Sequence, residues 1–188
     1  MIHVPAAVQR TRPAPLVLFF HGALRTVDAF VDSHQPLAEE LGVIILAPYA
    51  TEGTWDAIGG DFGRDVDVVD RALRWTFDRW AVDPGRVGLS GFSDGGTYAL
   101  ALGRANGDLF GRVAAYSPGF LLPVTPVGRP SILISHGTDD AVLPINRTSR
   151  RIVPELERQG YTVDYREFAG PHVLSRSAME AFVRGVVG

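Results

Sequence analysis

Short apolar runs alternate with longer amphipathic stretches along this chain, and the alternation predicts its architecture. The short runs predict strands at residues 16–20, 43–47, 86–90, 113–117, 131–135 and 162–168. Most of these runs are apolar at consecutive positions and not at alternate ones, as in strands that are covered on both faces of a parallel sheet.

The amphipathic stretches between these runs predict helices. In the clearest one, from Asp65 to Trp80, apolar residues recur at helical spacing: Val66, Val69, Leu73, Phe77 and Trp80. Acidic residues gather in its first turns and arginines follow, which complements the helix dipole. Further helices are predicted at 28–41, 95–104, 145–159 and 177–187. Pro154 should kink or divide the third of these.

Strands that alternate with helices predict one α/β domain over residues 1–188, a three-layer sandwich around a mostly parallel sheet. The length of 188 residues suits a single hydrophobic core. No repeat or low-complexity linker divides the chain. Residues 50–64 follow neither pattern, and connections of that length in such folds are often functional.

Composition narrows the possible functions. The net charge is −3, so a broad basic face for nucleic acid is not expected. The chain has no cysteine, which excludes disulfides, thiolate metal sites and a cysteine nucleophile. The histidines and acids show no metal-ligand spacing, so neither a metal nor an organic cofactor is expected. The sequence does not indicate an oligomeric state.

The amino-terminal region predicts neither a signal peptide nor a membrane span. Its apolar run, residues 16–20, lacks a preceding basic region and is too short to cross a bilayer. The simplest expectation is therefore a cytoplasmic protein, provided that Met1 is the natural start.

The turn between the strand at 86–90 and the helix at 95–104 contains the first chemical signal. Gly91-Phe92-Ser93-Asp94-Gly95 has the form G-x-S-x-G, which in a strand-turn-helix setting predicts a nucleophile elbow. The motif alone is weak, because a glycine-rich turn can simply connect a strand to a helix. A dinucleotide loop is disfavoured, since Ser93 stands where that motif needs its second glycine. Catalytic partners for Ser93 are needed to distinguish a nucleophile elbow from a simple connecting turn.

A nucleophilic serine needs a histidine base and an acid that orients it. In α/β-hydrolases they follow the serine in the order acid, then histidine. The chain has five histidines, and only His172 follows both Ser93 and the candidate acids. It lies in a loop after the last predicted strand, where the base belongs. Asp139 and Asp140 directly follow the strand at 131–135, and their spacing leaves both open as the acid.

The oxyanion of the tetrahedral intermediate needs backbone N–H donors. One candidate is the amide of Asp94, directly after the nucleophile. The other should come from the loop after the strand at 16–20, where Gly22 lets the backbone turn inward. Ala23 is the first choice there and Leu24 the second. His21 is interpreted as a structural histidine that braces this loop.

A substrate pocket is expected beside these groups. Its candidate walls are aromatic and aliphatic side chains from two connections: Trp55, Ile58, Phe62, Phe120 and Leu121. Such walls suit acyl or aryl groups. The alternative is that some of these residues only hold their loops against the core, and for Trp55 the two interpretations are balanced.

The motifs LFFHGALR, GLSGFSDGG, ISHGTDDAVLP and GPHVL, in this order, resemble the signature blocks of the phospholipase/carboxylesterase group of α/β-hydrolase serine esterases. Dienelactone-hydrolase-like proteins are near neighbours. The resemblance covers nearly the whole chain. It implies a compact α/β-hydrolase fold and a serine carboxylesterase. The chain is too short for a cap domain, so an open site that takes small acyl or aryl esters is expected. In that family the acid is the fifth residue of an H-G-x-x-D block, which implies Asp140.

The chain also departs from the family. Asp94 replaces a common glutamine, so its carboxylate should disfavour anionic substrates. The cysteine typical of dienelactone hydrolases is absent. Thioesterases and peptidases use the same triad, and a hydrolase-fold binding protein with little turnover is a further alternative. A flavodoxin-like phosphate binder would explain the turn at Ser93 but neither Asp140 nor His172.

Overall fold

The computed structural model describes residues 1–23, 27–60 and 62–188. These residues form one seven-stranded sheet in the order β1-β3-β2-β4-β5-β6-β7. The strands are β1 (Ile2–His3), β2 (Ala14–Phe20), β3 (Ile44–Leu46), β4 (Val82–Phe92), β5 (Arg112–Tyr116), β6 (Ser131–Gly137) and β7 (Val163–Phe168). Only β1 pairs antiparallel among them, and the other described pairs are parallel.

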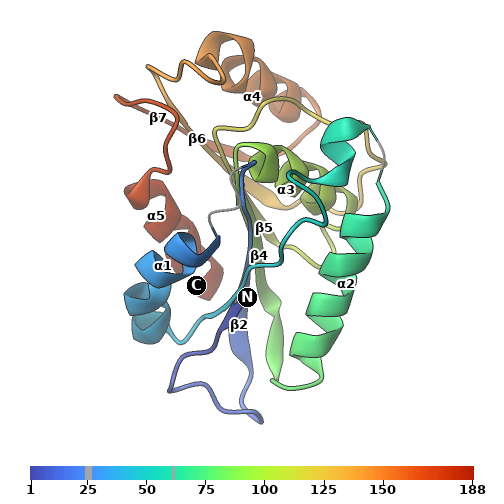
Figure 1. The fold of residues 1–188 in the computed structure, drawn as a ribbon, viewed down its shortest axis with the longest axis vertical. Helices are drawn as coiled ribbons and strands as arrows, with labels where there is room; N and C mark the ends of the chain where they lie inside the picture. The colour runs from blue at the N-terminus through green and yellow to red at the C-terminus, as the bar shows by residue number, and fades with distance from the viewer. Residues whose placement is uncertain (24–26, 61) are drawn as a thin grey trace.

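Helices cover both faces of the sheet, as Figure 1 shows. The helices α1 (Val27–Leu41) and α5 (Arg176–Val187) share one hydrophobic core with one face. The helices α2 (Arg64–Phe77), α3 (Asp94–Ala105) and α4 (Ser149–Arg158) share the other. The short 3₁₀ helices are η1 (Asp56–Gly59) and η2 (Ile145–Arg147).

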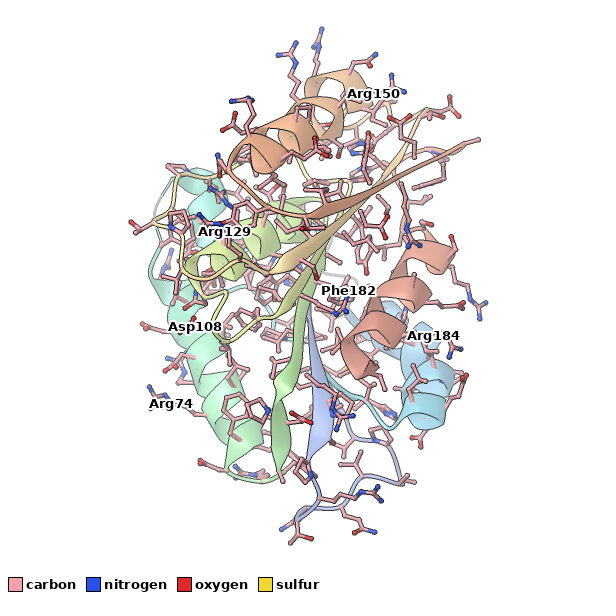
Figure 2. All side chains as sticks on the ribbon, turned by 180° about the vertical axis from the view of Figure 1, so that it is seen from behind. Arg74, Asp108, Arg129, Arg150, Phe182 and Arg184 are labelled. Atoms are coloured by element: carbon pink, nitrogen blue, oxygen red, sulfur yellow. The ribbon has the colours of Figure 1, made fainter. Side chains whose placement is uncertain are left out.

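Consecutive apolar residues in the strands serve both cores. In β2, Leu16 and Leu18 point to the core under α2 and α3, whereas Val17 and Phe19 point to the core under α1 and α5. Because both faces are covered, neither set can be polar. Figure 2 shows the same arrangement from behind, with Phe182 of α5 turned toward the sheet and Arg184 directed outward.

The predicted fold class is confirmed: helices pack on both faces of a mostly parallel sheet. No element of the described residues stands apart from these layers as a cap domain would. Local details differ. The two-residue strand β1 was not predicted. The helix expected at 145–159 divides at Thr148, not at Pro154, which lies inside α4.

Register brings the carboxyl ends of the central strands to one edge. Gly91 of β4 lies beside Phe20 of β2, and Phe92 lies beside Tyr116 of β5. On the far side, Gly137 of β6 lies beside Phe168 of β7. Loops that leave these ends therefore meet above β4, the edge where open α/β sheets bind ligands.

Candidate active site

Ser93 occupies a strained position between β4 and α3. Its backbone angles are φ 56° and ψ −119°, a region that residues other than glycine rarely adopt. Its N–H donates to the carbonyl of Tyr116 at 2.8 Å, which ties the turn to β5. The strained turn places Ser93 at the amino end of α3, where free amides and the helix dipole favour negative charge.

The glycines of the motif permit this turn because the chain passes very close to itself. A Cβ atom on Gly91 would lie 2.1 Å from the carbonyl oxygen of Gly95. A Cβ atom on Gly95 would lie 2.2 Å from the carbonyl oxygen of Phe20. Both contacts are with backbone, which cannot move aside as a flexible side chain would. The G-x-S-x-G spacing is thus a steric requirement of the turn.

Three side chains from separate loops lie in series at this edge. The Nε2 atom of His172, in the loop between β7 and α5, is 3.0 Å from Ser93 Oγ. The Nδ1 atom of His172 is 2.6 Å from Asp140 Oδ2. The Nδ1–H then donates to the carboxylate and Nε2 accepts the hydroxyl hydrogen, the tautomer that a general base requires. The ring also contacts Phe92 at a centroid distance of 4.7 Å.

Asp140 is held by its own loop. Its Oδ1 accepts from the amides of Val142 at 2.9 Å and Leu143 at 2.7 Å. Burial tends to raise the pKa of this carboxyl, but the Leu143 amide and His172 outweigh it and the pKa lies below its ordinary value. The group therefore stays a carboxylate at neutral pH. Asp139 is exposed, so the structure brings Asp140, and not its neighbour, to His172.

The loop after β2 reaches the nucleophile. A Cβ atom on Gly22 would lie 3.3 Å from the Cβ of Ser93, so the backbone that leads to Ala23 passes beside the serine. The amide of Asp94 belongs to the first turn of α3, whose N–H groups have no partner within the helix. Leu24, the second choice for the oxyanion site, lies outside the described residues.

His21 connects the loop after β2 to the loop after β3. Its Nδ1 is 2.7 Å from the carbonyl oxygen of Gly22, and its Nε2 accepts from the amide of Ala50 at 3.0 Å. The indole of Trp55 donates to the carbonyl of His21 at 2.8 Å. This bracing agrees with the structural role expected for His21.

A cavity of about 800 Å³ opens on the Ala23 and Asp94 side of Ser93. It is lined mainly by one connection between β3 and α2: Thr51, Glu52, Gly53, Thr54, Trp55, Asp56, Gly59, Phe62, Gly63 and Arg64. Small and polar residue types are the most numerous in this lining, and Trp55 and Phe62 are its aromatic members.

Of the five candidate pocket residues, two border this cavity and three do not. Phe62 lines the cavity and is 41% exposed. Trp55 also borders it, but its side chain is fully buried against the core. Ile58, Phe120 and Leu121 are not among the described lining residues. Ile58 and Leu121 pack against the core instead.

Two carboxylates shape the cavity loop. The buried Asp65 accepts from the amides of Thr51 at 2.8 Å and Asp56 at 2.7 Å. Asp56 in turn accepts from the amide of Gly63 at 2.9 Å. Between two lining residues, the Thr54 hydroxyl donates to Asp94 Oδ2 at 2.6 Å. The acids of α2 had been interpreted only through the helix dipole, so this use of Asp65 was missed.

The sequence interpretation also missed His136. It was set aside because it precedes the acid, yet its Nε2 lies 3.1 Å from Asp140 Oδ2. The signal was present in the H-G-x-x-D block that selects Asp140. Among the residues that the structure describes, no group of three or more acids and histidines is arranged to hold a metal. No described helix is both long and apolar enough to cross a bilayer.

Comparisons with known proteins find esterases and a depolymerase among the chains that this one resembles. The chain matches no protein-family model. It is 30% identical over 115 residues to a poly(3-hydroxybutyrate) depolymerase from Ralstonia pickettii, a match that covers 50% of this chain and 23% of that protein. A thermostable esterase of known structure is 25% identical with a TM-score of 0.73, over 90% of this chain and 50% of that one.

Esterase PE8 superimposes with a TM-score of 0.76 at 19% identity, over 98% of this chain and 99% of that chain. The chain has the α/β-hydrolase fold. It spans about a quarter of the depolymerase and half of the thermostable esterase.

Proposed function

We propose that the chain is a serine carboxylesterase that hydrolyses small esters at Ser93. The observation that carries this proposal is the series Ser93 Oγ, His172 Nε2, His172 Nδ1 and Asp140 Oδ2, with contacts of 3.0 and 2.6 Å. The likeness to esterases and to a polyester depolymerase supports the same reaction class.

In the first half of the cycle, Ser93 Oγ attacks the ester carbonyl carbon while its proton passes to His172 Nε2. The negative charge moves to the carbonyl oxygen, which accepts hydrogen bonds from the amides of Ala23 and Asp94. Asp140 stabilises the imidazolium that forms. The intermediate then collapses, the carbon–oxygen bond to the alcohol breaks, and His172 returns its proton to the leaving alcohol. The acyl group stays on Ser93.

In the second half, water replaces the alcohol. His172 takes a proton from the water as its oxygen attacks the acyl carbon, and the same amides hold the second oxyanion. Collapse then breaks the bond to Ser93 Oγ, which takes back the proton from His172. One ester and one water become one acid and one alcohol, and the protein returns to its starting state.

The cavity restricts which esters fit. Its described lining includes the carboxylates of Glu52, Asp56 and Asp94 and a single guanidinium, Arg64, which pairs with Glu52 at 2.6 Å. This excess of negative charge favours neutral or cationic esters over anionic ones. The part of the substrate that enters the cavity should carry hydrogen-bond donors, since carboxylate and hydroxyl oxygens are available there.

The direct test is a purified Ser93→Ala variant assayed with p-nitrophenyl acetate and a fluorophosphonate probe. We expect turnover to fall by about 10⁴-fold or more and labelling to disappear. Ser177→Ala, which removes an exposed hydroxyl from α5, is the matched control and should retain both. Retention of most hydrolysis by Ser93→Ala would refute the proposal. Labelling of the wild type without turnover would indicate a binding protein, and a panel with thioesters and peptides separates the remaining alternatives.

A further inference from the structure

His136 contacts Asp140 at the same carboxylate oxygen, Oδ2, that faces His172. It belongs to β6, and its side chain has no exposed surface. Its Nε2 atom is 3.1 Å from Asp140 Oδ2 and 2.8 Å from the carbonyl oxygen of Leu143. Its Nδ1 atom is 2.7 Å from Ser149 Oγ, at the start of α4. The catalytic cycle above does not use this residue.

The partners of His136 define its protonation. Both neighbours of Nε2 are acceptors, so Nε2 carries the hydrogen. It donates to the Leu143 carbonyl, and the Asp140 carboxylate lies close to the same N–H. Burial lowers the pKa of His136, although the Leu143 carbonyl and the Asp140 carboxylate oppose that effect. The ring is therefore neutral at neutral pH, and Nδ1 accepts from the Ser149 hydroxyl. His136 therefore faces Asp140 with a neutral N–H at 3.1 Å and not as a charged partner.

This donor completes the restraint of the carboxylate. Oδ1 of Asp140 is held by two loop amides, whereas Oδ2 lies close to both His172 Nδ1 and His136 Nε2. Leu143 closes the arrangement, because its N–H donates to Asp140 and its carbonyl accepts from His136. Without His136, Oδ2 would keep only the hydrogen bond that it makes to the catalytic imidazole.

We infer that His136 is a positioning residue that aligns Asp140 with His172. It does not touch the substrate and acts only through the carboxylate. The inference rests on the proposed function of Ser93, Asp140 and His172. The Nδ1 atom contacts Ser149 at the start of α4, whereas Nε2 contacts Asp140 and the Leu143 carbonyl of the same loop, so the positioning role depends on Nε2.

Three other ionisable groups near His136 could affect a pH profile: Asp140, His172 and Glu167. Asp140 and His172 lie on the active-site side, and Glu167 of β7 is its neighbour in the sheet register. A double hydrogen bond from Arg150 lowers the pKa of Glu167 to about 2. Glu167 therefore stays ionised throughout a practical assay range of about pH 5 to 9. A changed pH profile would then arise from the Asp140, His136 and His172 cluster.

Two substitutions distinguish the contributions of the two ring nitrogens of His136. The amide nitrogen of His136→Gln reaches about as far as Nε2 and can still donate to Asp140. The shorter His136→Asn reaches only the Nδ1 position, toward Ser149. We expect His136→Asn to lower kcat for p-nitrophenyl acetate by about 10- to 100-fold with little change in KM. His136→Gln should stay within about threefold of the wild type.

A double-mutant cycle tests whether the effect passes through Asp140. In an Asp140→Asn background, His136→Asn should reduce kcat by less than about twofold further, because the carboxylate that it aligns is gone. Multiplicative losses would overturn the inference, as would equal kcat values for His136→Asn and the wild type. If His136→Asn does not fold, His136→Gln carries the test alone: a folded variant with kcat lowered more than about tenfold contradicts the role.

Nitrogen-15 NMR of His172 gives a measurement that needs no turnover. In the wild type we expect the hydrogen on Nδ1, directed at Asp140. His136→Asn should shift part of the population to the Nε2–H tautomer, and His136→Gln should not. An unchanged tautomer in His136→Asn would overturn the inference. Absence of ester hydrolysis by the wild type would instead reject the proposed function, while the NMR result still decides the role of His136.

Discussion

The two sides of Ser93 are built by different means. On one side, Asp140 and His172 are fixed by hydrogen bonds that fully occupy the carboxylate and the ring, on loops that follow directly from β6 and β7. On the other side, the cavity is formed by a single long connection whose backbone amides are held by Asp65 and Asp56. In the function we propose, the first side would supply the chemistry and the second would select which esters reach it.

The difference has a physical consequence. The triad side depends on strand ends and short loops, so its positions follow from the sheet register. The cavity side depends on a few carboxylate–amide contacts that span up to 14 residues. We therefore expect substitutions on the triad side to change kcat, and substitutions on the cavity side to change KM and substrate preference.

The largest effect on activity is expected from Asp140→Asn. The amide would disfavour the Nδ1–H tautomer of His172 and would not stabilise the imidazolium, so kcat should fall by about 10³- to 10⁴-fold. Asp139→Asn is the matched control, since it removes the same charge from the exposed neighbouring residue. Comparable losses in the two variants would mean that the contact between Asp140 and His172 is not what supports catalysis.

The next effect concerns folding. Gly95→Ala places a Cβ atom 2.2 Å from the Phe20 carbonyl oxygen, where the backbone on both sides is fixed by the sheet and α3. We expect a loss of more than about 3 kcal/mol in the free energy of unfolding, measured by urea denaturation. Gly111→Ala, where a Cβ meets nothing within 4 Å, should be close to neutral. A stable Gly95→Ala protein would show that the turn at Ser93 is looser than described.

The parts of the fold and site that are encoded locally could be predicted from the sequence. The strands and the turn at Ser93 were predictable because each is encoded locally, by apolar runs or by glycine spacing. Asp140 and His172 could be proposed as partners because strand ends meet at one edge, and their roles remain predictions. The strand β1 could not be found, since two residues, Ile2 and His3, are too few for a periodic signal.

The cavity could not be predicted for a different reason. Its shape depends on backbone amides, which every residue type except proline supplies and which therefore leave no signature in the sequence. It also depends on Asp65, whose position on α2 resembles that of an ordinary acid at a helix start. The apolar side chains of Ile58 and Leu121 pack against the core, so hydrophobicity identified burial and not the cavity. His136 was missed because chain order identifies the members of a triad but not a residue that supports one.

An intermediate effect is expected from Asp65→Asn. One of the two amides that donate to Asp65 would lose its carboxylate acceptor. The loss of a hydrogen bond to a charged group costs about 1.5–3 kcal/mol and would loosen the cavity loop. KM should rise while kcat changes little. Asp67→Asn, an exposed substitution in the same first turn of α2, controls for the helix dipole. If kcat falls with KM unchanged, the division between the two sides is wrong.

The smallest effect is expected from Asp94→Asn, which keeps an acceptor for Thr54 but removes one charge from the cavity. The ratio of kcat/KM for an anionic ester to that for a neutral ester of the same size should rise about two- to fivefold, the scale of a partly exposed charge interaction. Asp139→Asn removes a charge from the same edge outside the described cavity lining and should leave the ratio unchanged. An unchanged ratio in Asp94→Asn would show that the cavity does not select by charge.

The most direct test of the central claim is a crystal structure of the protein after reaction with a small fluorophosphonate. The account predicts a phosphorus atom bonded to Ser93 Oγ, with the phosphoryl oxygen within hydrogen-bonding distance of the amides of Ala23 and Asp94, and His172 beside the serine. An adduct on another residue, or a phosphoryl oxygen directed away from both amides, would contradict it.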